Sequence, residues 1–314
     1  MVPGKPEVKT PRLGVVGVGH IGKNHARLYA ELPGAKFTAI FDTDRVVAQE
    51  RAAEFGVIAA ASLEEFAGQV DAASVATPTS THFDIARELL MRGKHVLVEK
   101  PIADNTVHAS ELAEMAAGRG LVLQVGHVER FNPVLGALEK RLTNPRFIEA
   151  HRLSPYPNRS TDIGVVLDLM IHDLEIILHL VRSPVRTFDA VGVPVLSRGE
   201  DIANARIRFE NGCVANITSS RISPEQMRKI RVFQEDVYLS LDYQNQTGEM
   251  YQRTASGLKR EEVEIEHEEP LKRELAAFVE CAATGRAPKV SGFQAAAALD
   301  LAVEITKHIA HEQV

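Results

Sequence analysis

A lysine stands at the end of an apolar run in the segment KHVLVEKPIA, residues 94–103. The run His95–Val98 has the pattern of a buried strand, and Glu99 and Lys100 follow it directly, before Pro101. A charge at the edge of an apolar core is costly unless a partner or a ligand uses it. An ion pair between Glu99 and Lys100 within the loop would meet this need, and so would a ligand at the strand end.

Polar residues also recur at helical spacing in the strongly apolar segment DIGVVLDLMIHDLEIILHL. Asp168, His172, Glu175 and His179 fall at i, i+4, i+7 and i+11, which places all four on one helix face. A carboxylate one turn from a histidine can orient the imidazole and stabilise its charge, as a general base requires. Such pairs can also ligate a metal, but no HExxH motif or carboxylate cluster accompanies them, so we predict no metal site. For His179, a partner within the core is a further alternative.

Three glycines in GVVGVGHIGKNH form a GxGxxG pattern after an apolar strand and at the start of a helix. Gly17 permits a tight turn, Gly19 lets a pyrophosphate approach the backbone, and Gly22 lets helix and strand pack closely. Asp42 ends the next strand, close to the spacing of about 20 residues expected for an acid that binds ribose hydroxyls. This carboxylate would repel a 2′-phosphate and favours NAD, whereas Arg45 keeps NADP open because a guanidinium could accept that phosphate.

The elements that would position these residues follow from the alternation along the chain. From residue 12 to about residue 125, short apolar runs alternate with Ala-rich helical stretches, as in parallel strands joined by helices. Six strand candidates make a doubly wound sheet, in which a ligand lies beyond the carboxyl ends of the strands. Lys100, Thr77 and His127 all follow strand ends, so we expect them to converge where a nicotinamide ring would lie.

The pattern changes after Gly126. The segment NPVLGALEKRL begins a helix with Asn132 as its cap and Pro133 in its first turn, and strand patterns then dominate. A run of strands without regular helices predicts an antiparallel sheet, and the alternation in ARIRFE and VEIEHE predicts one face in water. We therefore predict the α/β class: a doubly wound Rossmann sheet in residues 1–125, and an α+β domain with a large open, mostly antiparallel sheet in residues 126–314. The C-terminal helix could pack back on the first domain.

Composition limits the partners. The chain has 314 residues, 45% hydrophobic and 25% charged, which suffices for a full core and favours two domains. A net charge of −6 and the absence of a Lys/Arg-rich block argue against nucleic acid. Cys213 and Cys281 lie far apart, so we expect no disulfide framework or zinc site, and a cytoplasmic protein. No apolar segment suits a signal peptide or approaches the roughly 20 residues of a membrane span.

The glycine turn, the EKP motif at Glu99–Pro101 and the spacing of Gly164, Asp168 and His172 together resemble the Gfo/Idh/MocA family of sugar and cyclitol oxidoreductases. The resemblance covers nearly the whole chain. It implies that Lys100, Asp168 and His172 form the catalytic group and contact the substrate, that the Lys100–Pro101 bond is often cis, and that the C-terminal sheet joins copies into a homodimer or homotetramer. The residues expected to contact the cofactor lie in the glycine turn or near strand ends: Gly17, Gly19, His20, Ile21, Gly22, Asp42, Thr43, Arg45, Thr77, Pro78, Thr79, His82, Glu99, Lys100, Gln124 and His127.

The segment VGHVERFNPVLGAL resembles the nucleotide-sugar branch of that family, which includes UDP-N-acetylglucosamine 3-dehydrogenases. By that resemblance Glu129, Arg130 and Asn132 border the substrate, and Arg130 could meet a diphosphate. A helix cap plus a surface ion pair is the alternative. In the loop HRLSPYPNRSTDIG, Tyr156 and Arg159 could touch the sugar or the nucleotide.

These residues predict an NAD-dependent enzyme that oxidises a secondary sugar hydroxyl to a ketone, and the resemblance to the nucleotide-sugar branch implies C3 of a UDP-N-acetylhexosamine as the position oxidised. Either His172, held by Asp168, or Lys100 would act as the base. The alternatives are a family member that acts on inositol, a free sugar or another small substrate, and a non-catalytic NAD-binding regulator.

Overall fold

The computed structural model describes residues 10–156 and 163–312, which form two compact units. The first unit holds the chain up to His127 together with Leu271–Ala296, and the second holds Val128–Pro270 and the chain from Ala297 onward. The first unit thus includes helix α8 (Pro270–Thr284) almost entirely, and the first residues of helix α9 (Gly292–Glu312). The ranges expected from the sequence assign this segment to the second domain.

In the described part of the first unit, six parallel strands form one sheet in the order β3-β2-β1-β4-β5-β6. The predicted doubly wound sheet is therefore confirmed. The order reverses between β1 and β4, the place where ligands bind in this type of sheet. The strands are β1 (Arg12–Val16), β2 (Lys36–Phe41), β3 (Ile58–Ala59), β4 (Ala72–Val75), β5 (His95–Glu99) and β6 (Leu123–Gly126).

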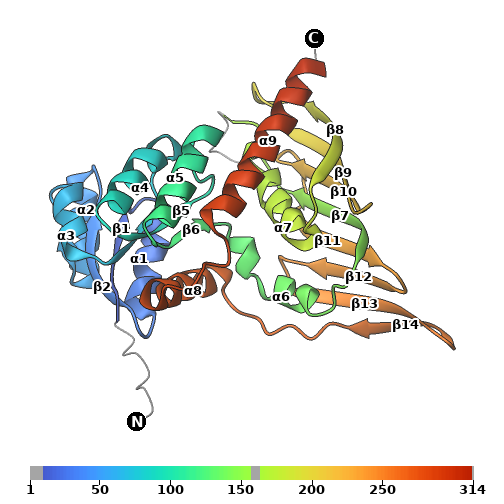
Figure 1. Ribbon diagram of the computed structural model, residues 1–314, viewed down its shortest axis with the longest axis horizontal. Helices are drawn as coiled ribbons and strands as arrows, with labels where there is room; N and C mark the ends of the chain where they lie inside the picture. Colours follow the sequence, from blue (N-terminus) through green and yellow to red (C-terminus); the bar gives the residue numbers. More distant parts are fainter. Residues whose placement is uncertain (1–9, 157–162, 313–314) are drawn as a thin grey trace. The chain divides into compact units, whose positions relative to one another are not determined.

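The connecting helices begin where the sequence provides caps. The side chains of Asp44, Ser62 and Asn105 each accept backbone N–H groups at a helix start, which satisfies donors that have no partner inside the helix. Helices α4 and α5 pack side by side (Figure 1). The helices are α1 (Gly22–Glu31), α2 (Arg45–Phe55), α3 (Leu63–Gln69), the 3₁₀ turn η1 (Thr79–Thr81), α4 (His82–Met91) and α5 (Thr106–Gly118).

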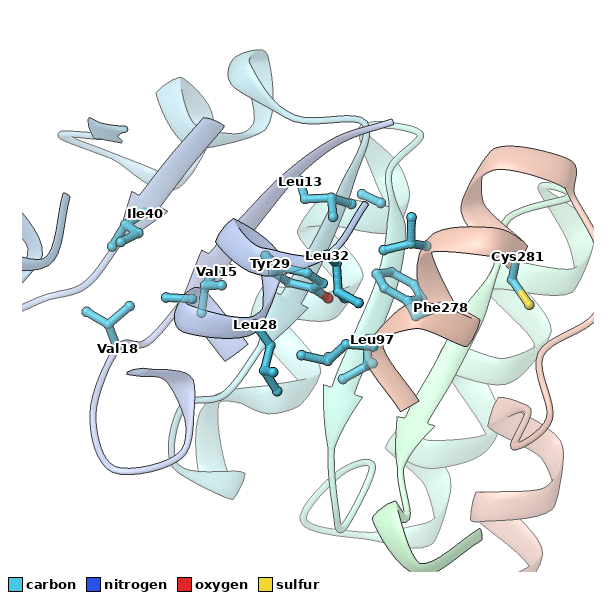
Figure 2. Close-up of a cluster of buried hydrophobic side chains, with 14 of the residues drawn as sticks. Leu13, Val15, Val18, Leu28, Tyr29, Leu32, Ile40, Leu97, Phe278 and Cys281 are labelled. Carbon is cyan, nitrogen blue, oxygen red and sulfur yellow. The ribbon is translucent and has the colours of Figure 1, made fainter. Parts of the chain in front are cut away.

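The core of the first unit lies between its sheet and helices α1, α2 and α8. Leu13 and Leu97 from the strands meet Tyr29 of α1 and Phe278 of α8 in one buried cluster (Figure 2). Apolar burial of this kind stabilises a fold by about 25 cal/mol per Å² removed from water. Because α8 supplies large side chains to this cluster, the segment Leu271–Ala296 belongs to the first unit, although it follows most of the second unit along the chain.

In the described part of the second unit, eight strands form a sheet in the order β14-β13-β12-β11-β7-β10-β9-β8. Only β7 and β10 pair in parallel, so the predicted large, mostly antiparallel sheet is confirmed. Strands β13 and β14 were not expected, because TGEMYQRT and GLKREE lack apolar alternation, whereas the predicted strand pattern VEIEHE, residues 263–268, lies just beyond β14 and is not a strand. The strands are β7 (Pro145–Leu153), β8 (Val185–Val193), β9 (Ile202–Phe209), β10 (Val214–Ser220), β11 (Met227–Gln234), β12 (Val237–Asp242), β13 (Thr247–Thr254) and β14 (Gly257–Glu262).

The helical segments of the second unit precede and follow strand β7. The 3₁₀ turn η2 (Val128–Phe131) leads into α6 (Pro133–Glu139), and a π-helical turn η3 (Val166–Met170) leads into α7 (Ile171–Val181). Asn132 caps α6, as the sequence predicts, by accepting the N–H of Val134 at 3.2 Å. The predicted long helix is thus present, but it starts with a π turn.

Candidate active site

The glycine turn after β1 has the geometry that its sequence predicts. Gly17 adopts φ +81°, and the N–H of Val18 donates to the Asp42 carboxylate at 2.8 Å. A Cβ at Gly22 would collide with the carbonyl oxygen of Gly17, whereas none of the described atoms lies within 4 Å of a Cβ built at Gly19. The backbone therefore leaves no room for a side chain at Gly22, where α1 begins, but is open at Gly19. This arrangement suits the approach of a dinucleotide's pyrophosphate to the backbone N–H groups.

The acid at the end of β2 is held in place by this turn. Besides accepting from Val18, the Asp42 carboxylate accepts the N–H of Asp44 at 2.9 Å. Arg45, which could meet a 2′-phosphate, donates to the carbonyl oxygen of Ala61 at 2.7 Å. His20, Ile21 and Thr43 are exposed along the same edge. The structure thus brings together the predicted residues of the turn and the acid.

The turn that carries Lys100 is tied to the end of β4 by a buried histidine. The Lys100–Pro101 peptide bond is cis, as the family resemblance implies. His82 places Nδ1 2.8 Å from the carbonyl oxygen of Pro101 and Nε2 2.9 Å from that of Thr77. Both ring nitrogens thus lie within hydrogen-bond distance of main-chain carbonyl oxygens. His82, predicted to contact the cofactor, therefore holds the turns that follow β4 and β5.

Glu99 lies next to a second buried histidine. Its Oε1 is 3.1 Å from Nε2 of His25, and a Cβ at Gly126 would approach the same carboxylate to 2.8 Å. Gln124, fully buried, donates to the main-chain oxygen of Glu274 at 3.1 Å. These contacts give Glu99 and Gln124 structural partners, while their predicted contacts with the cofactor remain a prediction.

The helix that carries Asp168 and His172 departs from regular α geometry at Asp168, just before His172. Asp168 lies within the π turn η3, and His172 is the second residue of α7. Short π-helical turns inside helices occur frequently at functional sites. The structure divides the predicted polar stripe: Asp168 and His172 are half-buried, Glu175 is buried, and His179 pairs with Glu139 at 2.8 Å. Burial lowers the pKa of His179, although its bond to Glu139 opposes the shift.

A buried ion network lies beside His172. The guanidinium of Arg152 donates to both carboxylate oxygens of Asp173, at 2.8 and 3.0 Å, and to Glu129 at 3.0 Å. Burial alone would raise the pKa of Glu129, but the charges of Arg152 and Arg228 outweigh it and lower that pKa. Asn132 donates to Glu129 at 3.2 Å. Glu129 and Asn132, predicted to border the substrate, are thus part of a network inside the second unit.

Arg130 is also an interior residue. It is 1% exposed, and its Nε lies 3.5 Å from the carboxylate of buried Glu175. Burial lowers the pKa of Arg130, and the charge of Glu175 opposes this shift. The alternative for this segment, a helix cap plus an ion pair, therefore describes the geometry well, except that the ion pairs are buried rather than on the surface. Substrate contacts by these residues remain a prediction.

Of the two loop residues predicted to touch the substrate, one is described. The hydroxyl of Tyr156 lies 2.9 Å from Oγ of Ser197, and its side chain is exposed. Arg159 lies outside the described residues. Within the described residues, no three His, Cys, Asp or Glu side chains are grouped as a metal ion would require.

Comparison with known proteins places this geometry in a family. Residues 11–127 match the model of an oxidoreductase family with an NAD-binding Rossmann fold, and residues 138–239 match the GFO/IDH/MocA C-terminal domain. The chain belongs to the Gfo/Idh/MocA oxidoreductase family. It is thus an NAD-binding dehydrogenase that acts on hydroxyl groups. None of its described helices is both long and apolar enough to cross a bilayer.

Two similar proteins have defined substrates. The dehydrogenase is 39% identical to UDP-N-acetylglucosamine 3-dehydrogenase of Acidithiobacillus ferrooxidans over 88% of this chain and 90% of that one. A solved structure of that enzyme has a TM-score of 0.91, with 95% of this chain and 97% of that chain covered at 37% identity. The scyllo-inositol 2-dehydrogenase of Bacillus subtilis is 27% identical over 68% of each chain.

Sequence reasoning missed a carboxyl group in the core of this dehydrogenase. Glu274 of α8 is fully buried, and neither of its carboxyl oxygens has a hydrogen-bond partner among the described residues. Burial, and then the nearby charge of Glu99, raise the pKa of Glu274 well above its ordinary value. The signal was available: Glu274 falls with Leu271, Leu275 and Phe278 at i, i+3, i+4 and i+7, so it occupies a core position of the amphipathic pattern.

The raised pKa of Glu274 predicts how a substitution changes stability with pH. A carboxyl with a raised folded-state pKa contributes stability below its unfolded pKa of about 4.3 and loses it as pH rises toward the folded-state pKa. Glu274→Gln should therefore raise the free energy of unfolding relative to the parent at neutral pH. The gain in the free energy of unfolding should grow by about 1.4 kcal/mol per pH unit between the unfolded-state and folded-state pKa values of Glu274, with no gain near pH 4. Denaturant titrations across pH measure this.

Glu280→Gln on the same helix is the matched control. Glu280 is exposed and pairs with Arg286 at 2.8 Å, so its loss should change the free energy of unfolding by less than about 1 kcal/mol at any pH. Equal pH profiles for the two variants would show that Glu274 titrates normally.

Proposed function

We propose that the dehydrogenase oxidises the C3 hydroxyl of a UDP-N-acetylhexosamine, with UDP-N-acetylglucosamine as substrate and NAD as oxidant. The observation that carries this proposal is the 39% identity, over 88% of the chain, to a UDP-N-acetylglucosamine 3-dehydrogenase. The presence of Lys100, Asp168 and His172 at the family's motif positions supports it, since these residue types suit the oxidation of an alcohol.

The proposed roles follow from the chemistry of each side chain. His172 takes the proton of the substrate hydroxyl, and Asp168 orients the imidazole and stabilises its positive charge. Lys100 donates a hydrogen bond to the same oxygen and stabilises the alkoxide charge that develops there, or acts as the base itself. Bound NAD supplies the acceptor for the hydride that leaves the carbinol carbon.

The proposed preference for NAD over NADP rests on the second strand. The Asp42 carboxylate is fixed at the strand end by the N–H groups of Val18 and Asp44, where it would repel a phosphate on the ribose. Arg45, the alternative phosphate partner, already donates to Ala61. We therefore expect a higher kcat/KM with NAD than with NADP.

The test is the rate of NADH formation with a panel of alcohols. Purified protein is mixed with NAD and UDP-N-acetylglucosamine, UDP-N-acetylgalactosamine, free N-acetylglucosamine, myo-inositol or scyllo-inositol. The proposal expects the highest kcat/KM with a UDP-N-acetylhexosamine. Turnover of an inositol or free sugar alone would favour the alternative substrate class, to which the scyllo-inositol 2-dehydrogenase relative belongs. Binding of NAD without turnover of any alcohol would favour a regulator.

We further propose that the outer face of the eight-stranded sheet joins copies of this chain into a homodimer or homotetramer. Four half-buried aromatic side chains cross this face from β7 to β13: Phe147, Phe233, Tyr238 and Tyr251. Their neighbouring ring centroids are 5.6, 4.5 and 5.3 Å apart. An aromatic stripe exposed on a sheet suits a protein interface, where aromatic residues are enriched.

Replacing the central tyrosine should separate the copies. In Tyr238→Glu, a buried charge would oppose association, so light scattering after gel filtration should give the mass of one chain, against a multiple of 34.4 kDa for the parent. Arg87→Glu, the same kind of charge change on the exposed helix α4 of the first unit, is the control and should leave the mass of the parent unchanged. A parent that is monomeric at all concentrations would contradict the proposed interface.

A further inference from the structure

The helix that carries Asp168 and His172 has a cap supplied by a distant part of the chain. The first N–H groups of a helix have no partner within it and must be satisfied from outside. Here the N–H of Val165 donates to the main-chain oxygen of Glu200 at 2.8 Å, and the N–H of Val166 donates to its carboxylate at 3.2 Å. Glu200 is only 7% exposed and follows Asp168 by more than thirty residues. One residue therefore satisfies two of the donors at this helix start.

A glycine makes this approach possible. A Cβ at Gly164 would collide with the carboxylate of Glu200, and a Cβ at Gly199 would lie 3.1 Å from the Cα of Gly164. The two backbones thus meet at a distance that side chains would prevent. Gly164 also accepts the N–H of Asp168 at 3.1 Å, so the residue that Glu200 packs against begins the turn that presents Asp168.

A fully buried ion pair holds the segment that supplies the cap. Asp201 accepts Nε of Arg221 at 2.9 Å, and its other oxygen accepts the N–H groups of Val195, Leu196 and Ser197. Arg221 also donates through Nη1 to the carbonyl oxygen of Ile163 at 2.7 Å. Burial alone would raise the pKa of Asp201, but these hydrogen bonds lower it, so the carboxylate stays charged. Arg221 therefore connects the residue beside Glu200 to the residue before Gly164.

The charge of Glu200 also suits its place. A carboxylate at a helix N-terminus is stabilised by the exposed N–H groups and the helix dipole. Asp168 and His172 lie within the next two turns, so a shift of the helix start changes the direction of both side chains. Misplacement of a reacting group by about 1 Å can lower a rate by about 10²-fold.

We propose that Glu200 is a positioning residue for the reaction: it caps the helix of Asp168 and His172 from outside, and the Asp201–Arg221 pair and Gly164 hold it in register. This inference rests on the proposed function, in which Asp168 and His172 act on the substrate hydroxyl. It assigns to Glu200 no contact with the substrate or the cofactor.

The test compares three substitutions by steady-state kinetics and hydrogen exchange. Glu200→Ala removes the side-chain acceptor, so kcat should fall by about 10- to 10²-fold while KM for NAD stays unchanged. Glu200→Gln keeps an oxygen for the N–H of Val166 and should restore most of the rate. In Glu200→Ala, amide exchange should accelerate in the peptide that contains residues 163–170. Ile230→Val, a conservative change in the core strand β11, controls for a general loss of stability and should change neither readout at the helix start.

The outcomes separate this inference from the proposed function. If Asp168→Asn and His172→Asn abolish turnover but Glu200→Ala retains the parent kcat, Glu200 does not position the helix and the inference fails. If Asp168→Asn and His172→Asn both turn over normally, the catalytic assignment fails, whatever Glu200 does. An equal loss of rate in Glu200→Gln and Glu200→Ala, without faster exchange, would also overturn the capping role.

Discussion

Replacing Lys100 by alanine should lower kcat by about 10³-fold, because it removes the donor that the proposed mechanism places at the developing alkoxide, and one such donor is worth up to this much. The dissociation constant of NAD should change little, since the glycine turn at Gly17–Gly22 and Asp42 are intact in this variant. Stopped-flow or steady-state rates of NADH formation, with NAD affinity from fluorescence titration, measure both quantities. A loss confined to kcat identifies an interaction made in the transition state.

Lys94→Ala provides the matched control. Lys94 precedes the same strand β5, at the opposite end from Lys100, and donates to the carbonyl oxygen of Val70 at 3.0 Å. It should keep the parent kcat. Near-normal turnover of Lys100→Ala would show that this lysine is not catalytic, and would favour the alternative that it forms an ion pair with Glu99 in the loop.

The second large effect concerns stability. Arg152→Met should lower the free energy of unfolding by about 3–5 kcal/mol, because it leaves the buried carboxylates of Asp173 and Glu129 without their main partner. Burial alone would lower the pKa of Arg152, but these two carboxylates outweigh it and raise the pKa, so the guanidinium stays charged in the parent. Urea titration followed by circular dichroism measures the change.

Arg51→Met is the control for this substitution. Arg51 pairs with Glu54 at 2.7 Å on the exposed side of α2 in the first unit, and the loss of such a pair costs less than about 1 kcal/mol.

The pH dependence of the Arg152→Met effect has a defined sign. In the parent the lowered pKa of Glu129 contributes stability above its unfolded pKa of about 4.3, which is lost as pH falls. The destabilisation by Arg152→Met should therefore shrink on acidification below about pH 4. An equal destabilisation at neutral pH and below about pH 4 would mean that the ion pairs of this network do not contribute to stability.

The parts of the fold that sequence predicts are those set by local rules. The GxGxxG turn, the acid at the end of the second strand and the cap at Asn132 each depend on residues close in the chain, and the structure has all three. Strand alternation also gives the class of both sheets. Strands β13 and β14 were not predicted, because pairing with neighbouring strands, rather than apolar alternation, defines them.

The remaining features depend on contacts between distant residues. Helical periodicity predicts a polar stripe from Asp168 to His179. The π turn alters the spacing of residues around the helix, and Glu175 lies in the interior, beside buried Arg130. The sequence predicts that the polar side chains after the sixth strand contact the substrate. In the structure, Glu129 accepts a hydrogen bond from Arg152 of β7. Such a partner, distant in the chain, cannot be predicted from a local sequence pattern. The same holds for Glu200, whose importance follows only from its contact with the helix start.

The position of the transferred hydrogen tests the central proposal most directly. UDP-N-acetylglucosamine deuterated at C3 is incubated with the enzyme and NAD, and the reduced nicotinamide is analysed by mass spectrometry and NMR. We expect deuterium to move to C4 of the nicotinamide, with a 3-keto sugar as the other product. NADH formed without deuterium, or no NADH at all while another polyol is oxidised, would contradict it.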